Sequence, residues 1–528
     1  MLTKSYKPLM VRMRNCVFLL CFMICCVGDE IFAQPNIQWQ KSLGGTAQDH
    51  VQSIHQTTDG GYICAGCSES NDGNVSGNHG GGGDFWVVKL NSSGNIEWQK
   101  ALGSSGFDFA QDVVQTSDGG YIVAGLSDMA NGDVTVNHGN SDYWVVKLSA
   151  TGSIQWQKSY GGTSIDVACS IKQTMEGGYI VAGYSFSNDV DATWNWGGKD
   201  YWIVKLGATG NLEWQKSYGG VLDEQPAYIE QTIDSGYVVG GISNSTNSGN
   251  VSNGYGLNDV WLIKMDKNGV LQWQKAMGGY QPDGCEMIKQ TPDKGYIVVG
   301  ASVSTSGDLS FTYGLSDYWV VKLDSLGNKQ WGNRYGGSYN EGASAVELTP
   351  DGGYLVAGPT ESYDNHVSFN HGYRDYWLIK LNSSGGLEWQ KTYGGYYDDW
   401  VVTMDKTSDG GCILAGYSDS NDGDVTGNHG LRDFWIVKLN SFLGTTEEVW
   451  GQNLTVYPNP VEDILCIQSD KTLKNAHLVI HDIFGKEIYT GIFSGMKVQL
   501  PIKVAPGMYT LQIRQDGQVS VKKFLVAH

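Results

Sequence analysis

The sequence predicts an all-β protein: a seven-bladed β-propeller followed by a small C-terminal β-sandwich. Three observations support this. First, a motif of the form WQKSYGG recurs at intervals of 58 or 59 residues, beginning at Trp39, Trp98, Trp156, Trp214, Trp273, Trp331 and Trp389. Second, each repeat of about 58 residues contains four short runs rich in β-branched and aromatic residues, separated by Gly-centred turns. Third, no run has a sustained helical period, and repeated four-stranded units of this size are typical of propellers.

One repeat, residues 165–220, illustrates the expected strands. Its four runs are DVACSIKQT, YIVAGYS, DYWIVKL and LEWQKSYGG. Trp202 opens the third run, and Trp214 follows twelve residues later across a hairpin. In a propeller both faces of a blade are covered by its neighbours, so wide aromatic side chains between blades replace a single central core. The WQKSYGG motif is therefore expected to form the outer strand of each blade.

The phase of the repeats predicts how the propeller closes. After the first 33 residues the chain begins with IQWQKSLGG, an outer strand that lacks the three strands before it. The last repeat ends at DFWIVKL and lacks an outer strand of its own. We expect Ile37 to Gly45 to complete the blade made by the final three strands. Such closure removes the exposed sheet edges of an open array.

Residues 1–33 are predicted to be a signal peptide. Four basic residues precede the apolar run CVFLLCFMICCVG, which has the length of a signal-peptide core and is short for a membrane span. No later stretch is apolar enough to cross a bilayer. The predicted boundaries are therefore a signal peptide at 1–33, a propeller at 34–440, a linker at 441–452 and a C-terminal domain at 453–528.

Charge and cysteine content exclude two classes of protein. The formal net charge of −20 disfavours nucleic acid, whose phosphates require a basic surface. The six cysteines beyond the signal peptide occupy different places in different repeats, which argues against a disulfide framework. Cys64 and Cys67 form a C-x-x-C motif, but residues three apart on a strand point to opposite faces, which disfavours a redox or metal site.

Two resemblances extend this interpretation. The repeat DGGYIVAG…DYWVVKL resembles the β-propeller repeats of bacterial secreted proteins, which specify an architecture and no activity. The phrases VYPNPVEDILCIQ, LVIHDIFGKEIYTG and PGMYTLQIRQDGQVSVKKFLV resemble the C-terminal sorting domain of the type IX (Por) secretion system. This second resemblance implies export across a Gram-negative outer membrane by the secretion machinery. It also implies removal of the tail by a sortase, and a mature protein that is either secreted or attached to the outer cell surface.

Catalytic motifs are absent from the sequence. H-E-x-x-H, G-x-S-x-G and a phosphate-binding loop do not occur. An Asp precedes the third strand in every repeat, and we expect it to accept backbone N–H bonds there: Asp84, Asp142, Asp200, Asp259, Asp317, Asp375 and Asp433. A glycosidase would instead need two acids outside this pattern, taken from Asp223, Glu224, Glu286, Glu341, Glu361, Asp398 and Asp399. Solvated loop charge is the simpler interpretation of those seven.

A column of rings near the end of the loop between the second and third strands is the predicted binding site. One position in the loop is always a ring, and Trp194 adds a neighbour, so the candidates are His79, His138, Trp194, Trp196, Tyr255, Tyr313, His371 and His429. Such side chains can stack on sugars or hydrogen-bond to them. The alternative is that each ring packs on its own blade as a lid over the loop.

No metal or cofactor is predicted. The histidines of the column lack close chelating partners, and the stretches SNDGNV and SNDGDV miss the register of a calcium loop. The sequence favours a secreted or cell-surface propeller that binds a glycan or protein ligand on one face, without catalytic activity. The alternative is a polysaccharide-active enzyme, a glycosidase or lyase, on the same scaffold. A third interpretation is a structural surface-layer or adhesion component.

Overall fold

The computed structural model describes residues 34–441 and, further on, 455–458, 461, 463–482, 486–515 and 518–527. The predicted signal peptide and all of the predicted linker except Ser441 lie outside these ranges. Strands, turns and loops make up all the residues described, and none of those residues forms a helix. Within this part of the chain, therefore, no helix is available that could cross a membrane.

Residues 34–441, the repeat domain, form seven four-stranded antiparallel sheets. Six sheets take their strands consecutively along the chain. The first three are β2 (Asp49–Gln56), β3 (Tyr62–Ser68), β4 (Asp84–Leu90) and β5 (Ile96–Leu102); β6 (Asp108–Gln115), β7 (Tyr121–Ser127), β8 (Asp142–Leu148) and β9 (Ile154–Tyr160); and β10 (Asp166–Gln173), β11 (Tyr179–Ser185), β12 (Asp200–Leu206) and β13 (Leu212–Tyr218).

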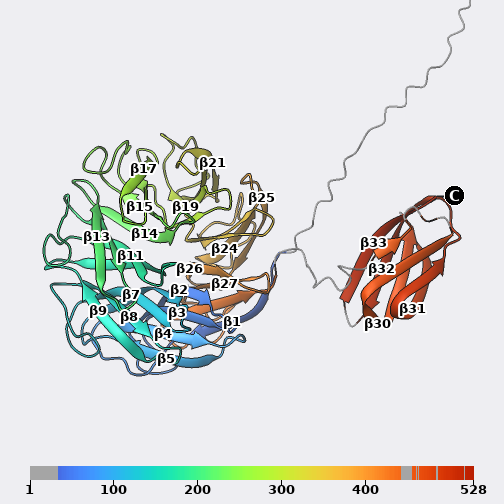
Figure 1. Ribbon diagram of the computed structural model, residues 1–528, viewed down its shortest axis with the longest axis horizontal. Coiled ribbons are helices and arrows are strands. Elements are labelled where there is room, and N and C mark those ends of the chain that lie inside the picture. Colours follow the sequence, from blue (N-terminus) through green and yellow to red (C-terminus); the bar gives the residue numbers. More distant parts are fainter. Residues whose placement is uncertain are drawn as a thin grey trace, which may run out of the picture. The chain divides into compact units, whose positions relative to one another are not determined.

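The next three sheets follow the same order. They are β14 (Glu224–Gln231), β15 (Tyr237–Ser243), β16 (Asp259–Met265) and β17 (Leu271–Met277); β18 (Met287–Gln290), β19 (Tyr296–Ser302), β20 (Asp317–Leu323) and β21 (Lys329–Tyr335); and β22 (Ala345–Leu348), β23 (Tyr354–Thr360), β24 (Asp375–Leu381) and β25 (Leu387–Tyr393). Figure 1 shows the sheets of this domain arranged around a common centre, with the sequence running round it from blue to orange.

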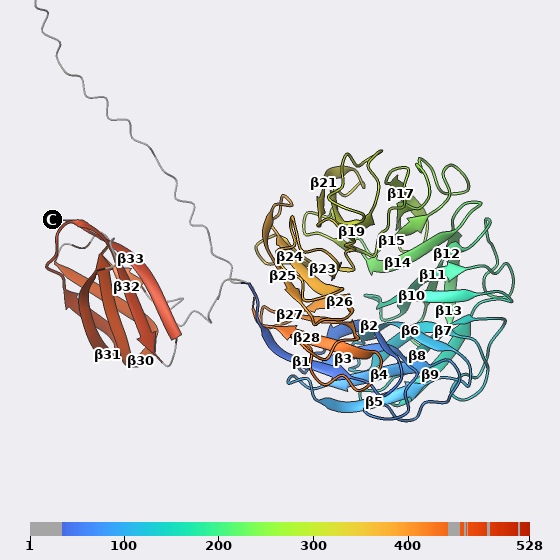
Figure 2. The ribbon, with the colours of Figure 1, turned by 180° about the vertical axis from the view of Figure 1, so that it is seen from behind.

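The remaining sheet joins the two ends of the repeat domain. It contains β26 (Asp399–Lys406), β27 (Cys412–Ser418), β28 (Asp433–Leu439) and β1 (Ile37–Leu43), with β1 on the outside, paired to β28. Figure 2 shows blue β1 beside orange β28. The indole N–H of Trp435 donates to the Gln40 side chain at 3.0 Å. The prediction that Ile37 to Gly45 supplies the missing outer strand is therefore confirmed.

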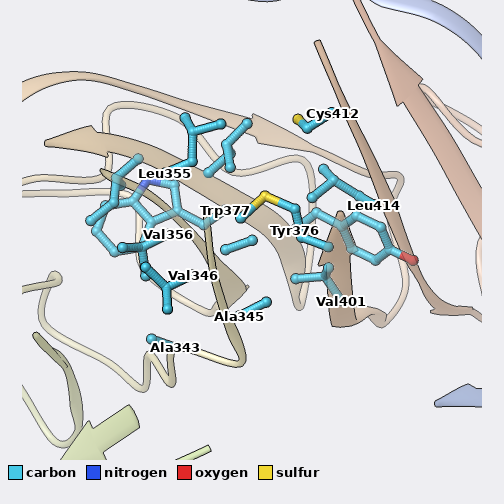
Figure 3. Close-up of a cluster of buried hydrophobic side chains, with 14 of the residues drawn as sticks. Ala343, Ala345, Val346, Leu355, Val356, Tyr376, Trp377, Val401, Cys412 and Leu414 are labelled. Atoms are coloured by element: carbon cyan, nitrogen blue, oxygen red, sulfur yellow. The ribbon is translucent and has the colours of Figure 1, made fainter. Parts of the chain in front are cut away.

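The core of the repeat domain lies between neighbouring sheets. All seven residues of each third strand are buried, because their side chains alternate between two faces that are both covered. Tyr143 packs against Trp202 of the next sheet with ring centroids 4.6 Å apart, and its hydroxyl donates to the Trp202 carbonyl at 2.9 Å. Phe434 packs against Trp86 in the same way, at 4.6 Å, which joins the last sheet to the first. Figure 3 shows Tyr376 and Trp377, consecutive in β24, pointing in opposite directions within one such cluster.

These observations confirm an all-β fold built from repeated four-stranded sheets in a propeller-like arrangement. Each inner strand contacts the inner strand of the next sheet, and β26 contacts β2. The inner strands therefore surround the centre of the domain, and the outer strands lie at its rim.

The C-terminal domain is a separate β structure. Its strands are β29 (Thr455–Tyr457), β30 (Ile464–Asp482), β31 (Glu487–Pro501), β32 (Gly507–Gln515) and β33 (Gln518–Val526). They follow the order β29-β30-β32-β33, and β31 also pairs with β30. The core includes Leu478, Leu511 and Ile513, all nearly or fully buried. A C-terminal β domain is thus confirmed, and its description as a two-layered sandwich stays a prediction.

Candidate functional site

Two kinds of connection share one end of the repeat domain. The loops from the second to the third strand and the crossings from each outer strand to the next inner strand both lie at the same strand ends, since the sheets are antiparallel. They are hydrogen-bonded to each other: the backbone N–H and the hydroxyl of Thr46 in a crossing donate to Asp72 in a loop, at 2.7 and 2.8 Å. Thr163 and Asp189 repeat this pattern at 2.8 Å for both bonds. We call this end the loop face.

The Asp that begins each third strand holds its own loop in place. One carboxyl oxygen accepts the backbone N–H of the ring-column residue in all seven repeats, as predicted. The N–O distance is 2.6 to 2.9 Å in six of them. The seven aspartates therefore have a structural role that repeats with the fold.

The ring column separates into two groups. In the four histidines, ring Nδ1 lies 2.6 to 2.8 Å from the same carboxyl group that accepts the backbone N–H: His79, His138, His371 and His429. The second group consists of Trp196, Tyr255 and Tyr313, whose side chains are exposed, with exposed fractions of 39, 40 and 37 %. Trp194 is 57 % exposed and lies edge-on to Trp196, with ring centroids 5.7 Å apart. The column as a ligand site stays a prediction, and the histidine geometry favours loop packing for that group.

Exposed aromatic side chains are confined to the loop face. Among the described residues fourteen are exposed, and each lies in a loop or crossing of that face: Phe107, Phe186, Trp194, Trp196, Tyr255, Tyr280, Phe311, Tyr313, Tyr339, Tyr363, Phe369, Tyr373, Tyr396 and Tyr397. Thirteen of them fall between Phe186 and Tyr397, so one arc of the face carries nearly all. The rings of Tyr373 and Tyr397 are nearly parallel, at an interplanar angle of 7°.

Seven pairs of buried carboxyl groups lie beneath the loop face. Each joins the Asp of a third strand to an acid at the next crossing, and every member is at most 2 % exposed: Asp433/Asp49, Asp84/Asp108, Asp142/Asp166, Asp200/Glu224, Asp259/Asp283, Asp317/Glu341 and Asp375/Asp399. The first Gly of each crossing fits against the pair. A Cβ on Gly44 would lie 2.5 Å from an oxygen of Asp433 and 2.5 Å from an oxygen of Asp49, so glycine is required there.

This pattern corrects one sequence interpretation. Glu224, Glu341 and Asp399 are not acids outside the repeat, because each occupies the same place as Asp49 in another sheet. The position equivalent to Asp49 holds Asp in some repeats and Glu in others, so the repeated acid was not recognised in the sequence. Its signal in the sequence is an acid four residues after the second Gly of every Gly-Gly crossing, as in Glu224 after Gly220.

Burial of the pairs raises the proton affinity of several of their members. The second carboxyl oxygen of every third-strand Asp is buried and has no hydrogen-bond partner among the described residues. Two carboxylates cannot bond to each other unless one of them is protonated. Burial and the neighbouring acid raise the pKa of Asp49 to about 6, and those of Asp200 and Asp399 to about 7. The fold therefore favours the protonated form of these groups.

We expect stability to fall as the pH rises from 5 to 8. An acid with a raised folded pKa stabilises the fold below its ordinary pKa of 3.8 and loses that contribution as the pH passes the folded value, near 7 for Asp200. Asp200→Asn mimics the protonated acid, so it should change stability little at pH 5 and increase it at pH 8 by on the order of 1–3 kcal/mol. Urea unfolding at both pH values measures this, with Glu69→Gln, an exposed acid in a loop, as the control. A wild-type protein more stable at pH 8 than at pH 5 would contradict the raised pKa values of these acids.

A central cavity of about 760 Å³ lies among the inner strands. None of the eight predicted site residues lines it. His55 and Asp112 line it and belong to a chain of charges of alternating sign. His55 lies 3.9 Å from Asp112 and 3.5 Å from Asp405, and Lys172 lies 2.5 Å from Asp112. Burial lowers the pKa of His55, but hydrogen bonds to Asp112 and Asp405 outweigh this and raise it to about 9.

Sequence reasoning missed these charged groups. Most of them precede the last residue of an inner strand, as His55 precedes Gln56 and Lys172 precedes Gln173. Across the seven repeats this position holds His55, Val114, Lys172, Glu230, Lys289, Glu347 and Asp405, so no single letter recurs throughout. The available signal was that this position is ionisable in most repeats, with a charge whose sign differs from repeat to repeat.

The cysteines and metal-ligating side chains show no reactive cluster. Cys64 and Cys67 are buried free thiols, and burial raises the pKa of both above the ordinary value. Across the described residues, no three His, Cys, Asp or Glu side chains are placed together to hold a metal ion.

Comparison with known proteins identifies the C-terminal domain. Residues 455–527 match the family described as secretion system C-terminal sorting domain. The chain carries a type IX sorting domain. This sorting domain marks the protein for export to the cell surface or the extracellular space. No curated protein matches the sequence.

Comparison with solved structures finds weak similarities. One is PorZ of Porphyromonas gingivalis, a surface component of the type IX secretion system, at 11 % identity, 89 % coverage of this chain, 69 % of that chain and a TM-score of 0.28. Puromycin hydrolase is 10 % identical, with 80 % and 59 % coverage and a TM-score of 0.45. Synechocystis apocarotenoid oxygenase is 10 % identical, with 71 % and 98 % coverage and a TM-score of 0.35. The chain spans less than two thirds of puromycin hydrolase, and similarity this low carries no information about function.

The structure of the sorting domain shows where the residues of these sequence phrases lie. The phrase LVIHD forms the last part of β30, and its buried Leu478 and Ile480 pair with Ile513 and Leu511 in β32. The hydroxyl of Tyr509 donates to the Ala505 carbonyl at 2.8 Å, which fixes the start of β32. Leu478, Ile480, Leu511 and Ile513 of these phrases thus belong to the core of the sorting domain.

Proposed function

We propose that this protein is an exported, non-catalytic binding module. In this proposal the repeat domain is a closed seven-bladed propeller that presents its loop face to a ligand outside the cell. The sorting domain directs export and is then removed by a sortase. The pairing of β1 with β28 supports the closed ring, because it leaves no sheet with an unpaired third strand at the junction of the two chain ends.

The observation that carries the proposal is that all exposed aromatic side chains among the described residues lie on the loop face. Surface aromatics scattered at random would also occur on the opposite end and on the outer strands. Contiguous exposed apolar surface on a soluble protein marks interaction sites. The flat apolar rings of Trp194 and Trp196, edge-on to each other, suit the C–H faces of sugar rings. We therefore assign a carbohydrate as the ligand.

The enzyme alternative has less support from the geometry. A glycosidase needs two acids that act together on one bond. Two of the candidate acids, Glu361 and Asp398, both contact Arg374, at 2.6 and 3.8 Å, which is the arrangement of a structural ion-pair network. Three other candidates are buried members of the repeated carboxyl pairs. A site that repeats in every sheet does not supply the single set of groups that one reaction requires.

A glycan-array screen of the full chain tests the proposal. We expect binding to one glycan class, and we expect Trp194→Ala and Trp196→Ala each to weaken it about tenfold, or about 1.4 kcal/mol, because stacking is lost. Thermal unfolding should hardly change, since both rings are exposed and their loss opens no core cavity. Met175→Ala, an exposed apolar residue on a turn at the opposite end, is the matched control.

Two outcomes would count against this assignment. Binding that survives both tryptophan substitutions and also substitution of Tyr373 and Tyr397 would move the ligand away from the aromatic arc. Loss of several kcal/mol of stability in the tryptophan variants would show that these rings belong to the core, where large apolar truncations have that effect.

A further inference from the structure

Two glycines that follow the acids of the crossings have no conformational explanation. In five sheets the residue after this acid has a side chain of valine size or larger: His50, Phe109, Val167, Gln225 and Trp400. In the sheets of β18 and β22 it is Gly284 and Gly342. Neither glycine has a positive φ. The nearest non-adjacent described atom to an added Cβ would lie 3.6 Å away at Gly342 and 3.9 Å away at Gly284, so packing does not require glycine either.

The second strands of the same two sheets are also small at the facing position. Gly284 donates its N–H to the carbonyl of Ala301 at 2.8 Å, whereas Trp400 of the last sheet faces Tyr417. The residue equivalent to Ala301 in the next sheet is Pro359. The wall of the central cavity therefore has a recess, formed by three residues that line the cavity: Ala301, Gly342 and Pro359.

The recess is best explained as space for a ligand. A glycine inside a strand marks a bulge, the close approach of another backbone, or the approach of a ligand. The inner strands bulge in sheets that lack this glycine, as between Ala168 and Ser170. The distances around Gly342 and Gly284 show that no other described backbone approaches closely. The cavity volume of about 760 Å³ lies within the range of small-molecule sites.

A fixed group of polar side chains lies beside the recess. The Asn340 amide donates to one oxygen of Glu361 at 2.8 Å, and Nε of Arg374 donates to the other at 2.7 Å. Asn340 and Glu361 are two residues from Gly342 and Pro359, and both line the cavity together with Arg374. Among the described residues the side-chain oxygen of Asn340 accepts no hydrogen bond. The group therefore presents a free acceptor beside the N–H groups of a guanidinium.

The charges of the wall favour an uncharged ligand. An anion finds no free counterion, because each lining cation already contacts an acid: His55, Lys289 and Arg374. Both oxygens of Glu361 are bonded, so this group offers none to a cation. The methyl group of Ala301 and the ring of Pro359 add an apolar surface. Amide and guanidinium groups next to apolar surface suit the hydroxyl groups and the C–H face of a sugar.

We propose that the central cavity binds one neutral sugar unit, seated in the recess and hydrogen-bonded to Asn340 and Arg374. This proposal rests on the carbohydrate ligand proposed above and names the part of it that enters the cavity, which is the chain end. The remaining units of the glycan lie on the aromatic arc. A chain end fits because the cavity reaches the loop face at Asn340 and Glu361 and is surrounded by the inner strands of all seven sheets.

Saturation-transfer NMR titration of the full chain tests the recess with the methyl α-glycosides of glucose, galactose, mannose and N-acetylglucosamine, in which the methyl group replaces the rest of a glycan. We expect at least one of these to bind. Gly342→Val should weaken it about tenfold or more, because the new side chain fills the recess. Asn340→Ala, at an exposed residue, should weaken it about fivefold through a lost hydrogen bond. The methyl glycosides of glucuronic acid and glucosamine, which are charged, should bind more weakly than the neutral ligand.

A matched control and a folding measurement accompany these variants. Gly332→Val makes the same change on the outer strand β21, at an exposed glycine where an added Cβ also meets atoms no nearer than 3.6 Å, and it should leave binding unchanged. Gly342→Val should keep or raise the unfolding temperature, because valine occupies the equivalent position at Val167 and restricts the unfolded chain.

The tryptophan variants separate this proposal from the carbohydrate function. Trp194→Ala and Trp196→Ala should leave the affinity for the methyl glycoside unchanged. Glycoside binding that is lost in these two variants and kept in Gly342→Val would overturn the recess and support the loop-face site. Absence of binding by every neutral glycoside, full affinity in a folded Gly342→Val variant, or tighter binding of a charged glycoside would also overturn the recess. A negative glycan-array screen would instead count against the carbohydrate function itself.

Discussion

Deletion of residues 37–45 should unfold the junction of the repeat domain and cause the protein to aggregate. The deletion removes β1, so the whole length of β28 becomes an exposed edge that can pair with another chain. It also removes Trp39, whose ring packs edge-on against Tyr62 of the next sheet at 5.6 Å, and nearly buried Leu43. We expect a loss on the order of 5 kcal/mol, from these apolar contacts and the ladder hydrogen bonds together.

Size-exclusion chromatography and thermal unfolding measure this effect. A synthetic peptide of residues 37–45, added in trans, should bind the deleted protein and restore its monomeric state. A peptide of the same composition in scrambled order should not, because register places Ser42 opposite Trp435 and Lys41 opposite Ile436. A deletion variant that stays monomeric, with an unchanged unfolding temperature, would refute the closed ring.

Removal of the sorting domain should abolish surface delivery without unfolding the repeat domain. The core of the repeat domain is complete within residues 34–441, and the sorting domain has a hydrophobic core of its own. A chain ending at Ser441 should therefore accumulate, folded, in the periplasm of a type IX-competent host. Residues 453–528 fused to an unrelated periplasmic protein should carry that protein to the surface.

Surface proteolysis and mass spectrometry measure the location and the processing of both proteins. Because the mature protein is expected to lose its tail at an exposed connection, peptides of the sorting domain should be missing from the surface form. A fusion that carries residues 165–220 in place of the sorting domain is the control and should stay in the periplasm. A sorting domain with Ile513→Asp, which places a charge in its core, should also fail. Efficient surface delivery of the truncated chain would refute the assignment.

Much of the fold could be predicted from sequence motifs that repeat along the chain. The third-strand pattern DYWIVKL places an Asp at the strand entrance and a Trp between sheets, and both positions behave as expected. The unmatched outer strand at Ile37 predicted its partner more than 390 residues away, because a sheet edge without a partner is unfavourable. The apolar letters of LVIHD likewise lie in the core of the sorting domain.

The side-chain contacts of the candidate site were predicted less completely than the fold. The sequence left open whether His79 faces a ligand or packs on its own loop, and the structure places its Nδ1 against Asp84 within that loop. Glu224 looked like an isolated acid, although it is one half of a buried pair with Asp200. In both cases the partner is close in space. The distance between two side chains depends on how the chain packs, which the sequence pattern does not specify.

The sequence by itself determined the all-β class, the repeated four-stranded units, the closing strand and the sorting domain. Each of these rests on local periodicity or on a phrase that repeats, and hydrophobic patterning acts over a few residues at a time. Only the tertiary structure decided which charges meet. The carboxyl pairs and the charges of alternating sign around His55 arise where different sheets approach one another. Electrostatic energy depends on separation and burial, and both are properties of the packed sheets.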